Sequence, residues 1–293
     1  MMVPVPAPRI SVVVPTRGRP EALATCLAAL ARTTLAPDDI EIVVIGDGED
    51  VESPAPGAAG TIPVVWRRQA RSGPAAARNL GARTARAPVL AFTDDDCAPR
   101  PSWAPRMLAA VEAEPAALIG GAVRNGLPDN PWSVTSQLVL DVVVDMYNGR
   151  ADAPGFAPTS NLALRRDVFV ATGGFDERFR AAAAEDREFC DRCHALGHPL
   201  VLVDATVDHF HDLDARGFYR QAAAYGRGEA TYRNVCAEHG RRANLVRHSF
   251  YQRLARAALA QGLGRGSALM LRAAANQVVF LASYGALKLR PTR

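Results

Sequence analysis

The sequence predicts an α/β fold: a mostly parallel, Rossmann-like sheet flanked by helices, followed by a helical, basic C-terminal extension. Three apolar runs, Ile10–Val14, Ile40–Ile45 and Val89–Phe92, have the length of strands and lack polar alternation, as is typical of strands buried on both faces. Helices are expected between them, at 21–33 and 73–86. This alternation of strand and helix favours parallel βαβ units. A hydrophobic content of 48% is ample for a buried core.

The first helix is justified by its spacing, because Leu23, Leu27 and Leu30 recur along one helical face. A Pro- and Gly-rich loop at 53–60 then separates the second strand from a third, Ile62–Trp66. The first half of the chain therefore carries four expected strands.

The second half continues with a helix at Glu185–Leu196 and a strand at Leu200–Val203. Two helices are expected near the end of the chain, at 249–261 and 267–287, split by Gly262–Gly266. Basic residues flank the apolar faces of this last pair.

The charge is distributed unevenly. Residues 241–293 hold nine Arg and one Lys but no acid, a local +10, so the other residues carry 4 − 10 = −6. A basic tail on an acidic body predicts an anionic partner. We expect an interfacial helix pair on an anionic membrane. Packing against the rest of the chain or a partner subunit is an equal alternative. Nucleic acid is discounted, because the tail lacks interleaved aromatic residues.

Three adjacent carboxylates follow the fourth strand, at Asp94, Asp95 and Asp96. Adjacent carboxylates repel one another unless a cation or solvent offsets their charge. Their oxygens suit Mg²⁺ or Mn²⁺, although an acidic turn that closes a strand is the plainer interpretation. Parallel strands deliver their C-terminal loops to one edge of the sheet. We therefore expect Pro15–Arg19 and Asp47 to converge on these acids.

A second stretch, Arg71–Asn79, places Gly73 before small residues that open a helix, which allows a ligand to approach closely. Arg71 and Arg78 could pair with phosphate oxygens, or could be solvated surface arginines. Asp47 alone would more often be a turn residue than a ligand contact.

Seven motifs, in order along residues 10–215, resemble those of the family 2 glycosyltransferases of GT-A fold. They are Val14–Arg17, Gly46–Gly48, Gly73–Asn79, Thr93–Asp96, Asn161–Arg166, Gly173–Glu177 and Ala184–Asp186. One departure is the stretch Gly46-Asp47-Gly48-Glu49, where the family usually has Asp-Asp-Gly-Ser.

The resemblance implies transfer of a sugar from a nucleoside-diphosphate-sugar to an acceptor hydroxyl with inversion, dependent on Mn²⁺ or Mg²⁺. It implies a tail at 1–9, a catalytic domain at 10–215 and the helical extension at 216–293. The donor half of the domain would cover about 10–100 and the acceptor half about 115–215. The acceptor could belong to a cell-surface glycan, a glycolipid or a natural product.

The resemblance also assigns roles. The metal falls mainly to Asp96, with Asp94, His209 and His211 as further candidates; the two His alternate and so share a face. The expected contacts to the nucleotide-sugar are Pro15, Thr16, Arg17, Asp47, Arg71, Gly73, Arg78, Asn79, Asp94 and Asp95.

Asp186 is the expected catalytic base, with Glu185 in reserve, because a carboxylate at a helix N-terminus stays ionised. Without the resemblance, helix capping would be favoured. Asn161, Gly174 and Trp132 are expected on the acceptor side. For Trp132 and Trp103, the sequence favours burial in the core over contact with a sugar.

A non-catalytic nucleotide-sugar-binding or scaffold protein on the same fold is the alternative function. Both acidic sites are present, which favours the enzyme. The five cysteines are odd in number and have no disulfide-framework spacing, so we expect a cytoplasmic protein, peripheral to the membrane if the tail binds there.

Overall fold

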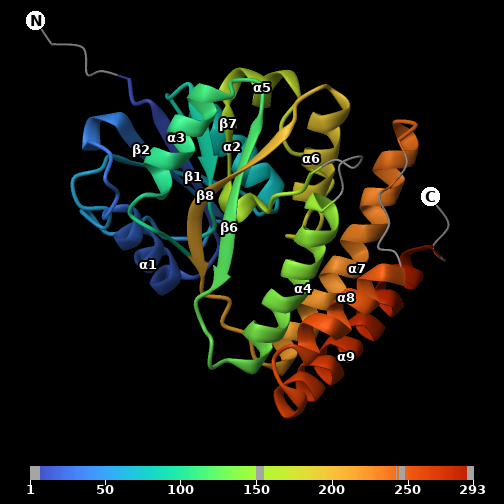
Figure 1. Ribbon diagram of the computed structural model, residues 1–293. Coiled ribbons are helices and arrows are strands. Elements are labelled where there is room, and N and C mark those ends of the chain that lie inside the picture. Colours follow the sequence, from blue (N-terminus) through green and yellow to red (C-terminus); the bar gives the residue numbers. More distant parts are fainter. Residues whose placement is uncertain (1–6, 150–154, 242, 244–247, 289–293) are drawn as a thin grey trace, which may run out of the picture.

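The computed structural model describes residues 7–149, 155–241, 243 and 248–288. An eight-stranded sheet forms the centre, and helices cover both of its faces (Figure 1). The strands are β1 (Ile10–Thr16), β2 (Ile40–Asp47), β3 (Val64–Gln69), β4 (Val89–Phe92), β5 (Cys97–Pro99), β6 (Leu118–Asn125), β7 (Leu162–Arg165) and β8 (Leu200–His209).

The helices are α1 (Pro20–Leu30), α2 (Pro74–Thr84), α3 (Trp103–Ala113), α4 (Pro131–Asn148), α5 (Arg166–Ala171), α6 (Glu185–Ala195), α7 (Ala215–Glu238), α8 (His248–Leu259) and α9 (Leu263–Lys288), with short 3-10 turns at η1 (Pro37–Asp39) and η2 (Thr159–Asn161). Helices α1 and α3 pack on one face of the sheet, and α2, α4, α5 and α6 pack on the other.

The sheet order is β3-β2-β1-β4-β7-β6-β8-β5. Strands β3, β2, β1 and β4 are parallel, as the sequence predicted, whereas β4 pairs with β7 in the antiparallel sense. The acids at 94–96 follow β4, where the parallel half ends and the mixed half begins. Such a switch point is where open α/β sheets bind ligands.

The third strand begins later than the sequence predicted and extends further. Ile62 is buried in a turn, and the pairing of β3 with β2 begins at Val64 opposite Ile42. The strand then runs through Arg67 and Gln69. Because β3 is an edge strand, polar side chains at its end can face solvent, which the apolar pattern could not reveal.

The break between the last two helices is shorter than expected. Gly262 alone takes a left-handed conformation, with φ +91°, and α9 begins immediately after it. Gly266 belongs to α9, and a Cβ there would lie 2.5 Å from the carbonyl oxygen of Ala258. Gly262 therefore breaks the chain between the two helices, and Gly266 allows α8 and α9 to approach closely.

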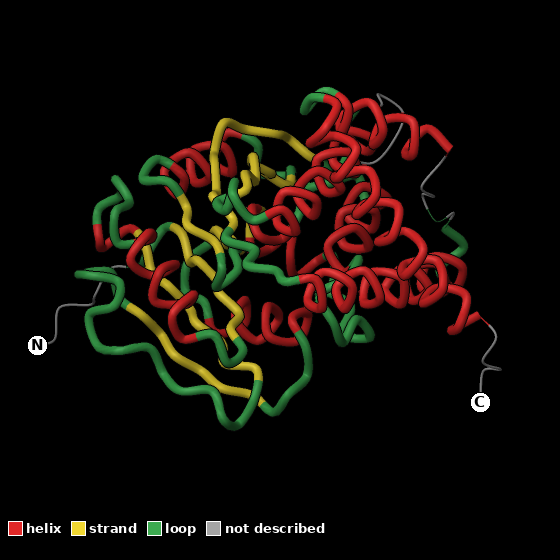
Figure 2. Tube along the Cα trace, turned by 90° about the horizontal axis from the view of Figure 1, so that it is seen from below, coloured by secondary structure: helices red, strands yellow, loops and turns green. Residues whose placement is uncertain are grey.

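The C-terminal helices pack beside the sheet domain (Figure 2). Residues of α4, α8 and α9 share a small apolar core containing Val142, Phe250 and Ala273. Helix α7 packs along α9, and at Gly226 a Cβ would lie 2.2 Å from the carbonyl oxygen of Phe280. Within the described residues, no helix combines the length and apolar character that a membrane span requires.

A second glycine of α7 brings the helix against the turn that precedes α6. At Gly228 a Cβ would lie 2.4 Å from the carbonyl oxygen of Ala183. Ala184, which follows Ala183 in the chain, has a left-handed φ of 67° and is the N-cap residue of α6. Helix α7 therefore supports the strained backbone on which Glu185 and Asp186 begin.

We expect Gly228→Ala to lower the free energy of unfolding by about 1–3 kcal/mol, because the new methyl group overlaps a backbone oxygen. Gly285→Ala in α9 is the matched control: a Cβ there meets no atom within 4 Å, and Ala gains up to about 1 kcal/mol in a helix. Urea unfolding of both variants measures the difference. Equal stabilities would contradict the close packing of α7.

Candidate active site

Asp95 is the structural member of the acid cluster. Its side chain is fully buried, accepts a hydrogen bond from Thr16 Oγ1 at 2.7 Å, and forms an ion pair with Arg19. Burial raises the pKa of Asp95 to about 6, against the opposing charge of Arg19. Asp95 thereby ties the loop after β1 to the loop after β4, and Thr16 lies at the edge of the sheet where the sequence placed it.

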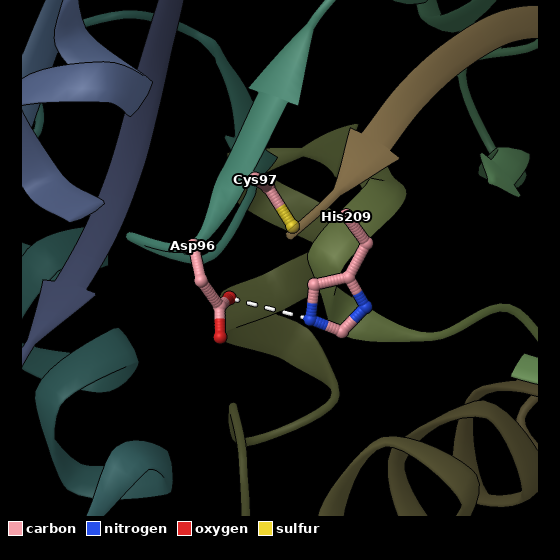
Figure 3. Close-up of side chains that lie close together, drawn as sticks. All are labelled: Asp96, Cys97 and His209. Carbon is pink, nitrogen blue, oxygen red and sulfur yellow. Dashed lines mark ion pairs between the residues drawn. The ribbon is translucent and has the colours of Figure 1, made fainter. Parts of the chain in front are cut away.

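Asp96 faces His209 across the end of β8. Asp96 Oδ1 lies 3.4 Å from His209 Nε2 (Figure 3). Asp96 Oδ2 forms an ion pair with Arg19. Although burial opposes the effect, the contact with His209 and the charge of Arg19 hold the pKa of Asp96 below its ordinary value. The Asp96 carboxylate in turn raises the pKa of His209, which burial alone would lower.

These two side chains fit a divalent cation. A carboxylate oxygen and an imidazole nitrogen that face each other are donors suited to Mn²⁺, with phosphate oxygens and water completing the shell. Cys97 Sγ lies within 4.8 Å of the same donor atoms. Burial raises the pKa of the Cys97 thiol well above its ordinary value, so it stays protonated and is the poorer ligand.

His211 lies behind His209. The two rings stack with centroids 4.4 Å apart and planes 21° apart, so both side chains do share a face. Gln221 Nε2 lies 2.8 Å from His211 Nε2, and Ser136 Oγ lies 3.4 Å from its Nδ1. Burial and the neighbouring His209 lower the pKa of His211 to about 4. A neutral His211 that is held by its neighbours supports His209.

Arg78 joins two acidic sites, the acids at 94–96 after β4 and the pair Glu185 and Asp186 at the start of α6. Its side chain is almost fully buried and donates to Asp94 Oδ1 at 2.7 Å and to Glu185 Oε1 at 2.8 Å. Glu185 Oε2 accepts from the Ala183 amide at 2.7 Å. Arg78 thus forms ion pairs with Glu185 and Asp94, which differs from the expectation that Arg78 meets phosphate directly.

Of the two carboxylates at the start of α6, that of Asp186 makes fewer hydrogen bonds than that of Glu185. Its Oδ1 accepts from the amide of Arg187 at 2.8 Å, and no hydrogen bond to Oδ2 occurs in the described part of the chain. Withdrawal from bulk water, followed by the charge of Glu185, raises the pKa of Asp186 to about 7. A carboxylate with that pKa and one unengaged oxygen is well matched to general-base catalysis near neutral pH.

Asp47 organises the loop that precedes α2. Its carboxylate accepts from the amides of Ser72 and Gly73 at 2.7 and 3.0 Å, and from Gln69 Nε2 at 2.9 Å. Gly73 has φ +95°, and a Cβ there would lie 2.6 Å from the carbonyl oxygen of Arg180. Both residues therefore have structural roles besides any contact with a nucleotide.

The remaining residues of the expected donor site differ in exposure. Pro15 is buried in β1. Arg17 and Arg71 are exposed, and neither has an ion-pair partner among the residues that the structure describes. Both are therefore available to a ligand.

Two expected ligand contacts have structural roles here. Asn79 Nδ2 donates to the carbonyl oxygen of Phe175, and Asn79 Oδ1 accepts from the Phe175 amide, both at 2.9 Å. Gly174 has φ +68°, and a Cβ there would lie 2.7 Å from Asn79 Oδ1. The amide of Asn79 thus holds a tight turn, and only glycine fits beside it.

The acceptor-side expectations for Asn161 and Trp132 also meet packing roles. Asn161 is fully buried and accepts from Trp103 Nε1 at 2.7 Å, so Trp103 lies in the core as the sequence favoured. Trp132 packs against Phe218 of α7, and Arg272 of α9 lies over its ring. Neither side chain lines the cavity described next.

A cavity of about 230 Å³ opens beside both acidic sites. Asp94, Glu185, Asp186 and His209 line the cavity, and helices α4, α7, α8 and α9 and the turn η2 contribute further lining residues. The C-terminal helices therefore complete the cavity that holds the candidate base. Sequence reasoning placed them on a membrane or a neighbouring surface with equal weight, and packing on the catalytic domain is the contact that the structure shows.

Residues 11–175 match the family described as Glycosyl transferase family 2. Validoxylamine A glucosyltransferase of Streptomyces hygroscopicus subsp. limoneus is 33% identical over 226 residues, which cover 67% of this chain and 50% of that protein. Pre-mycofactocin glycosyltransferase of Mycobacterium tuberculosis is 28% identical over 228 residues, covering 74% and 46%. The chain thus spans about half the length of these curated relatives.

Solved structures share the fold. Mannosyltransferase PcManGT from Pyrobaculum calidifontis, in complex with GDP-Man and Mn²⁺, aligns with a TM-score of 0.55 at 16% identity, covering 98% of this chain and 82% of that one. Staphylococcus aureus TarS 1–349 aligns with a TM-score of 0.53 at 14% identity, covering 97% and 93%.

We expect Arg78→Met to lower the free energy of unfolding by about 3–5 kcal/mol, because two carboxylates lose their buried partner. Arg165→Met is the control, since its exposed pair with Asp167 contributes at most about 1 kcal/mol. Urea unfolding at neutral pH compares the two variants. A loss at Arg78 no larger than that at Arg165 would contradict the bridging role.

Proposed function

The chain belongs to glycosyltransferase family 2, as its motifs predicted, and from that membership we propose that it transfers a sugar from a nucleoside-diphosphate-sugar to an acceptor hydroxyl with inversion. One observation carries the proposal: the open carboxylate of Asp186 shares a cavity with Asp94 and His209. A base and a candidate cation site thus flank one space, as transfer to a hydroxyl requires.

The proposed reaction is a single displacement. The acceptor oxygen attacks the anomeric carbon as Asp186 takes the hydroxyl proton, and the bond from that carbon to the diphosphate oxygen breaks. Attack opposite the leaving group inverts the centre, by the logic of one-step glycosidases. Glu185 is the poorer base, because Arg78 and the Ala183 amide already engage its two oxygens.

Asp96 and His209 would hold a divalent cation, Mn²⁺ or Mg²⁺, with Asp94 beside them. Such a cation offsets the charge of a departing diphosphate. The presence of Mn²⁺ with GDP-Man in the Pyrobaculum structure supports this assignment. Arg19, which the sequence analysis placed in the loop expected to converge on these acids but gave no role of its own, pairs with Asp95 and Asp96 and would keep this cluster compact.

The donor would lie along the edge formed by Thr16, Arg17, Asp47 and Arg71. The two exposed arginines are available to phosphate oxygens. Two relatives are named for their substrates, validoxylamine A and pre-mycofactocin, which supports a small-molecule acceptor; a cell-surface glycan and a glycolipid are the other two acceptor classes. The nucleobase of the donor follows from the titration described next.

Calorimetric titration with UDP, GDP and dTDP, each with and without Mn²⁺, tests the donor site. We expect one nucleotide to bind with Mn²⁺, and binding to fall at least about tenfold in Asp96→Ala, which loses a charged ligand. Asp176→Ala, at a carboxylate paired with Arg178 away from the cavity, is the control. If no nucleotide binds under any condition, the scaffold alternative replaces the enzyme.

Turnover of a nucleotide-sugar that carries the nucleobase identified by titration, measured between pH 5 and 9, tests the catalytic base. Because the pKa of Asp186 is raised to about 7 and only the ionised form accepts a proton, the rate should fall as pH drops below 7. Asp186→Asn should lose about 10²–10⁴-fold in kcat and this pH dependence. Glu185→Gln should keep the pH dependence. The reverse pattern would make Glu185 the base.

We also propose a cytoplasmic location at an anionic membrane surface. Leu271, Val278 and Leu281 project from one side of α9 and are 73%, 68% and 51% exposed, and residues 241–293 carry no acid. All five cysteines are free and buried, which agrees with a reducing compartment.

Co-sedimentation with vesicles of anionic and of neutral lipid tests this location. We expect binding to the anionic vesicles at low salt, lost in the variant Leu271→Gln/Leu281→Gln, because basic charge and apolar surface act together. Equal sedimentation of the variant, or none of the wild type, would refute membrane attachment.

A further inference from the structure

We propose that the far part of the cavity, walled by α4, α7 and α9, is the acceptor site and takes a neutral, hydroxyl-rich ring compound, with Asn276 and Gln277 as specificity-determining residues. The inference rests on the proposed function and adds the substrate class. No motif of the family match reaches these residues, because that match ends at residue 175.

The first support is a side-chain amide in the cavity wall whose N–H groups have no protein partner among the described residues. Asn276 lines the cavity and is only 7% exposed. Its one side-chain hydrogen bond in the described residues is a long one, 3.4 Å, which Oδ1 accepts from Gln277 Nε2. The N–H groups of Asn276 Nδ2 therefore have no partner there. These N–H groups are therefore free to donate to a ligand in the cavity that Asn276 lines.

Two neighbouring side-chain amides supply hydrogen-bond acceptors beside the Asn276 donor. Gln277 and Gln137 both line the cavity. Gln137 donates from Nε2 to Asp141 at 2.7 Å and to the carbonyl oxygen of Val123 at 3.1 Å, which leaves its Oε1 open. A hydroxyl group both donates and accepts, and a carboxamide does the same. This set of groups therefore suits a compound with several hydroxyls.

Apolar side chains line the same space. Leu140 and Val143 of α4 line the cavity together with Phe250 of α8 and Phe280 of α9. Such surfaces pack against the C–H faces of a ring. The volume, about 230 Å³, lies below the 300–1,000 Å³ typical of sites for drug-sized ligands, so a compact acceptor fits better than a polymer.

The charge of the cavity disfavours an anionic acceptor. Its two arginines are already paired, Arg78 with Asp94 and Glu185, and Arg187 with Glu229. Asp186 has no ion-pair partner among the described residues. A carboxylate or phosphate on the acceptor would meet like charge beside the base.

Tyr225 of α7 connects this wall to the base. Its side chain faces the cavity, and the residue is 39% exposed. The phenol lines the same cavity as the carboxylates of Asp186 and Glu185, and a tyrosine hydroxyl is protonated near neutral pH, so it is a hydrogen-bond donor there. It can therefore hold an acceptor hydroxyl close to Asp186 in the orientation that proton transfer needs.

Saturation-transfer NMR on the full chain without donor tests the proposal. The probes are methyl β-D-glucopyranoside and myo-inositol, compared with methyl β-D-glucuronide and cyclohexanol. We expect transfer to the two neutral polyols and weaker transfer to the anionic and singly hydroxylated probes.

Asn276→Leu and Gln277→Leu keep side-chain size but remove hydrogen bonds. Each should weaken polyol binding about fivefold or more, the equivalent of one lost hydrogen bond. Ala282→Gln, at an exposed position of the same helix, should leave polyol binding unchanged. Unchanged melting temperatures and nucleotide binding in the two Leu variants would show that they remain folded.

Two failures are distinguishable. If nucleotides bind with Mn²⁺ but neither polyol shows transfer, or if Asn276→Leu binds polyols as wild type does, the acceptor inference is wrong and the proposed function stands. If no nucleotide binds, the proposed function itself fails.

Discussion

The buried guanidinium of Arg78 is the interaction on which the site depends. It lies between Asp94, which follows the parallel half of the sheet, and Glu185, which opens α6 in the second half. Without it, two groups of carboxylates would face each other across one cavity and repel. Because of Arg78, the acids at 94–96, which form the candidate cation site, can lie close to Asp186, the candidate base.

The same pairing separates the roles of the neighbouring acids. Glu185 is held by Arg78 and a backbone amide, whereas Asp186, one residue later, keeps an open oxygen and a raised pKa. The left-handed Ala184 sets the direction in which both carboxylates leave the turn. Because Gly228 of α7 packs on this turn, the C-terminal helices influence the base as well as the cavity wall.

The C-terminal helices show how one segment can serve two surfaces. The side of α9 that carries Asn276 and Phe280 lines the cavity, while the side that carries Leu271 and Val278 is exposed. An amphipathic pattern in the sequence is compatible with either surface. The packing of α9 against α4, α7 and α8 decides which side faces the site.

The sequence by itself determined the buried parallel strands, the convergence of their loops and the acids at 94–96, because strand periodicity and topology place those residues at one edge. It also predicted the candidate base. The tertiary structure decided which polar residues remain open to a ligand. Asn79 and Asn161 are taken up by turns and core contacts, while Arg19 and Asn276 face the site. Hydrogen-bond partners distant in sequence make that choice, and no local pattern records them.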